Sequence, residues 1–125
     1  MGAITNYKRI KQVVDFTGLC QGFTPTDIDG LIEFRDKAYV FIEIKTGNAP
    51  LPFGQKLAIE RLVRDTGKEK KSIGIVASHN IYNSRMNIIA AECIVRNIYS
   101  SEDLQWRDVH GICLRDCIRW FISQI

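Results

Sequence analysis

The architecture of this chain is set by residues 25–45, which read PTDIDGLIEFRDKAYVFIEIK. In the first half apolar and acidic residues alternate, and this alternation predicts a half-buried strand over Asp27–Phe34. The second half, Tyr39–Lys45, is rich in β-branched and aromatic residues and predicts another strand. A short polar turn, Arg35–Lys37, separates the two, so we expect an antiparallel hairpin.

Helices and further strands are expected on both sides of this hairpin. Apolar residues at helical spacing predict helices before, between and after the strands. The expected elements are a helix over Asn6–Leu19, a helix from Gly54 or Gln55 to about Arg64, a strand over Ser72–Ala77, a strand over Cys93–Tyr99 and a helix over Val109–Ile125. The order αββαββα predicts an α/β fold in which helices flank a mixed β-sheet, with a parallel crossover around the middle helix.

The composition is that of a globular protein with one core. The chain has 125 residues, 46% of them hydrophobic, and a formal net charge of +3. This length fits a single domain over residues 1–125. The small basic excess is compatible with a nucleic-acid partner without requiring one. No apolar run approaches the roughly 20 residues that span a bilayer, so we expect an intracellular, cytoplasmic protein with no membrane partner.

The end of the second strand carries residues suited to catalysis. Residues two apart in a strand share a face, so Glu43 and Lys45 are expected to point the same way. Asp29, on the neighbouring strand, is expected to place its carboxylate beside Glu43. Two converging carboxylates repel each other unless a cation lies between them, and oxygen ligands suit Mg²⁺ or Mn²⁺. With a lysine beside them, these groups are the parts that phosphodiester hydrolysis needs.

The pattern formed by Asp29 and Glu43-Ile44-Lys45 resembles the signature of the PD-(D/E)XK nuclease superfamily, an aspartate followed at a distance by Asp or Glu, any residue, and Lys. That superfamily has a restriction endonuclease-like fold and includes restriction enzymes, Holliday junction resolvases, RecB-type nucleases and the VRR-NUC group. The resemblance covers about residues 24–77. The expected element order has one strand fewer than the family core before the second helix, and we place the missing strand near residues 20–23.

The resemblance implies a role for each matching residue. Asp29 and Glu43 would bind the metal, with the backbone carbonyl of Ile44 as a further ligand. Lys45 would position or activate the attacking water. Gln55 corresponds to a glutamine that opens the following helix in RecB-type and VRR-NUC members, although no tyrosine stands four residues after it.

Asp27 is an alternative to Asp29 as a metal ligand. It is expected on the same strand face, and it would bind the metal directly or assist from outside the ligand shell. A plainer interpretation of the whole motif also stays open. In that interpretation Glu43 and Lys45 form a charge pair at a strand edge, and the two aspartates serve turns.

Other polar and cysteine residues invite functional interpretations of their own. Lysines and arginines follow the motif and are expected either to contact phosphates or to form a solvated helix face: Lys56, Arg61, Arg64, Lys68, Lys70 and Lys71. The four cysteines, Cys20, Cys93, Cys113 and Cys117, occur in the order found in iron–sulfur nucleases. Packed, reduced thiols are the favoured interpretation. We assign His79 no catalytic role.

Taken together, these residues predict a divalent-metal-dependent DNA endonuclease. The lack of room for a separate sequence-reading domain favours structure-selective cutting in DNA repair, recombination or phage DNA processing. The contrasting hypothesis is a non-catalytic DNA-binding or assembly module with a nuclease-like fold. A homodimer, formed through the apolar stripe of the helix at Val109–Ile125, is a further expectation.

Overall fold

The structure is a computed structural model and describes residues 14–22 and 25–125. These residues form five strands, two α-helices and a short 3₁₀ helix, η2, that precedes the fourth strand. In chain order the elements are β1 (Gly30–Phe34), β2 (Ala38–Thr46), α1 (Phe53–Thr66), β3 (Lys71–His79), η2 (Ala90–Glu92), β4 (Ile94–Ser100), β5 (Trp106–Asp108) and α2 (Leu114–Ile122).

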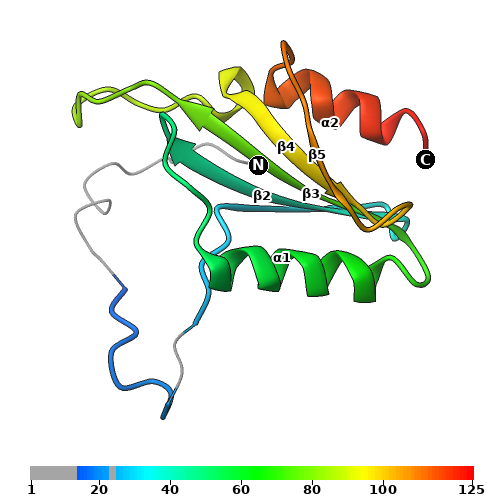
Figure 1. Cartoon of the computed structure of the whole chain (residues 1–125), viewed down its shortest axis with the longest axis horizontal. Helices are drawn as coiled ribbons and strands as arrows, with labels where there is room; N and C mark the ends of the chain where they lie inside the picture. Colours follow the sequence, from blue (N-terminus) through cyan, green and yellow to red (C-terminus); the bar gives the residue numbers. More distant parts are fainter. Residues whose placement is uncertain (1–13, 23–24) are drawn as a thin grey trace.

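The strands form one mixed sheet in the order β1-β2-β3-β4-β5 (Figure 1). β2 and β3 are parallel, whereas every other neighbouring pair is antiparallel. The predicted hairpin is confirmed, because Gly30 pairs with Ile42 and Phe34 with Ala38. The predicted parallel crossover is also confirmed, since α1 joins β2 to β3. The chain is therefore an α/β protein with a mixed sheet flanked by helices.

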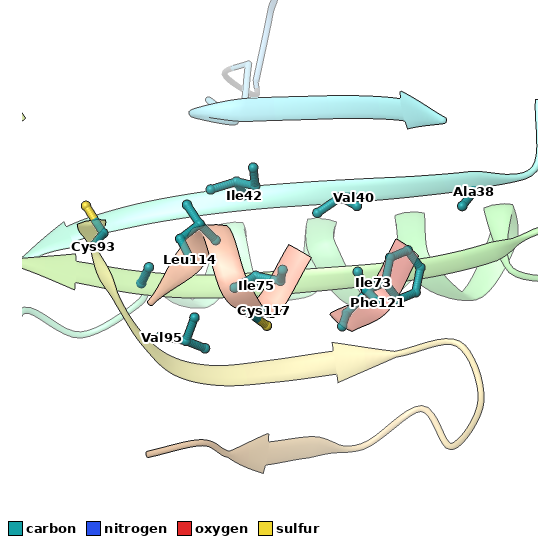
Figure 2. Close-up of a cluster of buried hydrophobic side chains, with 11 residues drawn as sticks. Ala38, Val40, Ile42, Ile73, Ile75, Cys93, Val95, Leu114, Cys117 and Phe121 are labelled. Atoms are coloured by element: carbon teal, nitrogen blue, oxygen red, sulfur yellow. The ribbon is translucent and has the colours of Figure 1, made fainter. Parts of the chain in front are cut away.

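One helix covers each face of the sheet, and the larger core lies under α2 (Figure 2). Even-numbered residues of β2 and odd-numbered residues of β3 point to this face, as the two-residue period of a strand requires. They pack against Leu114, Cys117 and Phe121, which lie on one side of α2 and are buried. The apolar stripe of the C-terminal helix is thus used inside the chain, and it gives no support to the expected homodimer.

The opposite face packs against α1. Phe41 of β2 meets Ile59 and Val63 of the helix, and all three are buried. The helix approaches β3 closely at Gly74, where an added Cβ would lie 2.3 Å from Cγ2 of Ile59. No larger residue fits without moving α1, so this glycine fixes how near the helix lies to the sheet.

Two predictions at the start of the chain are wrong in the described residues. β1 begins at Gly30, so Asp27 and Asp29 precede the strand instead of lying within it. The part of the predicted first helix at residues 14–19 is not helical, and it runs into a turn with Gly18 at φ +80°. The rest of that helix, residues 6–13, lies outside the described residues.

The expected extra strand near residues 20–23 is also wrong where the structure describes it, since residues 20–22 form a bend. The structure has a strand that was not expected, β5, at the far edge beside β4; because β5 follows α1, it does not supply the strand that the family core has before this helix. The C-terminal helix begins at Leu114, five residues later than expected. Residues before it run alongside β4, where Cys113 bridges Ile94 and the Ile112 carbonyl accepts a hydrogen bond from the Val95 N–H.

Neither helix in the described part of the chain has the length and apolar character needed to cross a bilayer. The prediction of packed thiols is confirmed for Cys93 and Cys117, which are buried in the core under α2. Burial raises the pKa of the Cys117 thiol to about 11. Cys20 and Cys113 are half-buried, and all four cysteines are free.

Candidate active site

The candidate residues lie where β2 ends and α1 begins. Ile42 belongs to the core under α2, so its neighbours in the strand, Phe41 and Glu43, face α1. Lys45 lies on the same face as Glu43, as the sequence predicts, and the two side chains form an ion pair with 3.4 Å between Nζ and Oε1. This end of the sheet therefore carries both charges on the side of α1.

Glu43 is an ionisable side chain deep inside the protein. The residue is 2% exposed, and its second carboxylate oxygen, Oε2, is buried without a hydrogen-bond partner among the described residues. Burial raises the pKa of the Glu43 carboxyl, and the negative charge of Asp29 raises this pKa further. The ammonium of Lys45 acts in the opposite direction. A buried carboxylate with an unpaired oxygen is costly, which points to a role other than stability.

Asp29 lies beside Glu43 although it precedes β1. Gly30 pairs with Ile42, so continuing this register by one residue puts Asp29 opposite Glu43. The Oδ2 atom of Asp29 accepts a hydrogen bond of 2.7 Å from the backbone N–H of Ile44. The aspartate side chain thus takes the place of a strand partner just where β1 ends.

This hydrogen bond also places the carbonyl of Ile44. In a strand, the N–H and C=O of one residue point to the same side, which lets paired residues exchange both hydrogen bonds. Since the N–H of Ile44 points to the side of Asp29, its carbonyl oxygen faces the same open edge. Two carboxylates and a backbone carbonyl are therefore available at one end of β2.

Lys45 is held by the first turn of α1. Its Nζ donates a hydrogen bond of 2.8 Å to Oε1 of Gln55, and its side chain is 17% exposed. The helix begins directly after Pro52, a residue whose fixed φ suits the start of a helix. Gln55 takes one of the three N–H donors of the ammonium, and the carboxylate of Glu43 lies 3.4 Å away as an ion-pair partner.

Asp27 is not brought into this group. It is exposed, it lies outside β1, and no hydrogen bond or ion pair of the described residues joins it to Glu43. The expectation that Asp27 and Asp29 share a strand face is wrong because the strand starts only at Gly30. Across residues 14–22 and 25–125, no three His, Cys, Asp or Glu residues gather as a group that could hold a metal ion.

The donor set nevertheless fits a small hard cation. Mg²⁺ is commonly held by one or two carboxylates, with waters and substrate phosphate in the other positions. Asp29 and Glu43 supply two carboxylates, and the unpaired Oε2 of Glu43 is a ligand atom without another partner among the described residues. The Ile44 carbonyl would add a third oxygen, so the residues present fit Mg²⁺ or Mn²⁺.

Two polar residues of β4 near Glu43 were not predicted from the sequence: Asn97, which lies on the same face as Glu43, and Arg96, which reaches the loop before α1. Glu43 pairs with Val76, which pairs with Asn97, whose buried Oδ1 also lacks a partner among the described residues. The register shifts there, because Val76 pairs with Asn97 but the next residue pairs with Val95, so Arg96 is an extra residue. Its guanidinium donates a hydrogen bond of 2.6 Å to the carbonyl of Ala49, in the loop between β2 and α1. No local signal in the sequence marks this bulge.

Lys70 and Lys71, two of the basic residues after the motif, lie away from the site. Lys71 pairs with Ala38 at the beginning of β2, whereas Lys45 pairs with Ser78. The separation along β3 is roughly 23 Å at about 3.3 Å per residue. Lys70 and Lys71 also form ion pairs, with Asp36 and Glu102 respectively. They therefore favour the solvated surface over a contact with phosphate at the site.

His79 borders the site through Thr46. The Thr46 hydroxyl and Nε2 of His79 are 3.2 Å apart, and Nδ1 of the ring accepts a hydrogen bond from the backbone N–H of Ile81. An accepting Nδ1 places the proton of the neutral ring on Nε2, which then donates to Thr46. The histidine thus connects the end of β2 to the loop after β3.

Comparison of the chain with protein-family models, with curated proteins and with solved structures found no match.

Proposed function

We propose that this protein is a divalent-metal-dependent deoxyribonuclease, an endonuclease that hydrolyses phosphodiester bonds in DNA. The observation that carries the proposal is the buried carboxylate of Glu43. It is flanked by Asp29 and Lys45, and its Oε2 lacks a partner among the described residues. Neighbouring carboxylates at a buried site repel each other in the absence of a cation, whereas a bound cation offsets their charge.

Each residue of the group has a distinct role in this reaction. Asp29, Glu43 and the carbonyl of Ile44 would hold Mg²⁺ or Mn²⁺. When bound, the metal lowers the pKa of a coordinated water and offsets charge on the phosphate. Lys45 would direct an N–H donor that Gln55 does not use at the attacking water or a phosphate oxygen. Gln55 is a positioning residue, because its carbonyl oxygen holds the ammonium of Lys45.

The motif supports placing the chain with the PD-(D/E)XK nucleases and their restriction endonuclease-like fold. A hairpin carries the aspartate and the Glu-x-Lys triplet, and the following helix carries a glutamine that contacts the lysine. The positions of Asp29, Glu43 and Lys45 fit the resemblance, whereas the match at Gln55 is incomplete because Ile59 stands where RecB-type and VRR-NUC members have a tyrosine. We propose structure-selective cutting in DNA repair, recombination or phage DNA processing.

The test is a cleavage assay on supercoiled, branched, nicked, flapped and single-stranded DNA. Each substrate is incubated with Mg²⁺, with Mn²⁺ and with a chelator. We expect cutting of at least one structure with metal and none with chelator. Replacing Lys45 by alanine should lower the rate at least about 100-fold, as loss of one charge-stabilising donor does elsewhere.

Lys37→Ala is the matched control, because Lys37 is exposed and lies in the turn before β2, at the opposite end of the sheet. Its rate should equal that of the wild type, and both variants should give the wild-type circular dichroism spectrum. Cutting that persists in Lys45→Ala would mean that these residues do not carry the activity. A protein that cuts no substrate with either metal would favour the non-catalytic DNA-binding module.

A further inference from the structure

A pocket of about 540 Å³ opens next to the candidate active site. It is formed by the end of β3, the segment that follows it and the start of β4. Its apolar walls include Met86, Ile88 and Ile89, and polar groups come from Asn80 and Asn87. Pockets of this size take a single small molecule or one nucleotide unit.

Residues that line the pocket lie beside residues of the candidate active site. Ser78, which lines the pocket, is the strand partner of Lys45 on β2, and paired strands lie about 4.8 Å apart. His79, another lining residue, is joined to Thr46. Tyr82, in the loop after β3, packs against Gly47, in the loop after β2. A Cβ added at Gly47 would lie 2.6 Å from the Tyr82 hydroxyl. A phosphate at Lys45 would thus have the pocket beside it.

The lining indicates a neutral, flat ligand with polar edges. No lysine or arginine stands among the described residues that line the pocket, and Glu92 adds an acidic group, so an anion is disfavoured. Apolar side chains suit the faces of a nucleobase, and the amides of Asn80 and Asn87 offer both donors and acceptors to its edge. Proteins read unstacked bases with this combination of apolar contact and edge hydrogen bonds.

We infer that this pocket holds one unstacked nucleobase of the strand that is cut, next to the scissile phosphate. The inference rests on the proposed nuclease function and narrows the class of DNA that the nuclease would cut. A base inside a regular duplex does not reach such a pocket, whereas a base in a single strand, a flap or a branch point does so at little cost. The pocket thus selects DNA in which the flanking base is already unpaired.

Binding can be measured without any cleavage. The chain has two methionines, Met1 and Met86, so labelling the methionine methyl groups with ¹³C gives two signals, and Met86→Leu assigns one of them. In the presence of a chelator, titration with deoxyadenosine or deoxycytidine monophosphate should shift the Met86 signal. Titration with 2-deoxyribose 5-phosphate, which lacks a base, should not. No shift with either nucleotide, or an equal shift with the sugar phosphate, overturns the inference.

A substitution that fills the pocket gives a second binding test. Ile89 is 57% exposed, so Ile89→Trp narrows the pocket without disturbing the core, and it should weaken nucleotide binding at least tenfold. Gln124→Trp adds the same side chain near the beginning of β3, where its backbone carbonyl meets Lys71, and should leave binding unchanged. Equal affinity in Ile89→Trp and the wild type counts against the pocket.

A cleavage experiment separates failure of this inference from failure of the proposed function. Oligonucleotides with one abasic residue at successive positions around the cut should be cut at least tenfold more slowly at one flanking position. If cutting is insensitive to every abasic position, the base pocket is wrong and the nuclease stands. If no DNA is cut while the Met86 signal still shifts with nucleotides only, the pocket stands and the nuclease proposal fails.

Discussion

Replacing Glu43 by glutamine should make the metal-free protein more stable while abolishing its activity. The wild-type carboxylate is buried, and its Oε2 has no partner among the described residues. A buried polar group without a partner costs about 1–3 kcal/mol, and more when it is charged. Glutamine has nearly the same shape and no charge, but it exchanges the ion pair with Lys45 for an ordinary hydrogen bond. We expect a net gain of about 1 kcal/mol, or about 4 °C in Tm for a chain of this length.

The difference in stability between Glu43→Gln and the wild type should depend on pH. Burial and the charge of Asp29 raise the pKa of Glu43 in the folded state above its ordinary value of 4.5. Below that value both the folded and the unfolded states are protonated, and the cost is absent. As the pH rises through the folded pKa, the unfolded state releases its proton first, so wild-type stability falls relative to Glu43→Gln. Above the folded pKa the difference is constant.

The assay is thermal unfolding followed by circular dichroism between pH 4 and pH 8, with a chelator present. Glu69→Gln is the control, because Glu69 is exposed and undergoes the same chemical change. Adding Mg²⁺ at ten times its Kd should stabilise the wild type by about 1.4 kcal/mol and leave Glu43→Gln nearly unchanged. A Glu43→Gln protein that melts below the wild type at pH 8 in chelator would show that the buried carboxylate of Glu43 does not destabilise the fold.

Three further experiments have expected outcomes. Gly74→Ala should lower the free energy of unfolding by about 1–3 kcal/mol in denaturant titrations, because its methyl group would collide with Ile59. Gln55→Leu should lower kcat with little change in KM, since Lys45 loses the acceptor that holds it, and Gln55→Glu should restore part of the rate. In the native protein at pH 8, the Cys117 thiol should react with a disulfide reagent far more slowly than after unfolding, because its pKa is about 11 and it is buried.

The parts of the fold that follow from local pattern were predictable. The run of β-branched and aromatic residues in Tyr39–Lys45 specifies β2, and the period of two puts Glu43 and Lys45 on one face. The structure agrees on both points. The position of Gln55 at the start of a helix also followed from helical spacing. Local rules suffice here because each element buries its own apolar face.

Features that depend on contacts between distant segments were not predictable. β5 is short and has no alternation of its own, and it exists because Trp106 to Asp108 pair with β4. The close packing of α1 against the sheet requires a glycine at position 74 of β3, and the sequence pattern of the helix does not indicate this contact. Arg96 reaches Ala49 only because the register of β4 shifts, and nothing near it in the sequence indicates a bulge.

The sequence pattern predicted a start of β1 that is too early, for a related reason. Alternation in the sequence continues through Asp27, but Asp29 uses its side chain to accept the hydrogen bond from Ile44. A backbone pairing that would have extended the strand is thereby replaced. The hydrogen bond between Asp29 and Ile44 that shortens β1 also holds the Asp29 carboxylate beside Glu43. The wrongly predicted start of β1 therefore coincides with the candidate active site.

The turns that precede β2, β3 and β5 have a practical consequence. Residues 35–37, 67–70 and 101–105 gather at one end of the sheet, where Lys70 pairs with Asp36 and Ser101 bonds to Ser72. Glu43 and Lys45 lie at the other end. A fluorophore or a surface tether attached at 101–105 would therefore hold the molecule at one end of the sheet and leave the candidate active site at the other end accessible, a geometry suited to testing the proposed cleavage on single molecules of long DNA.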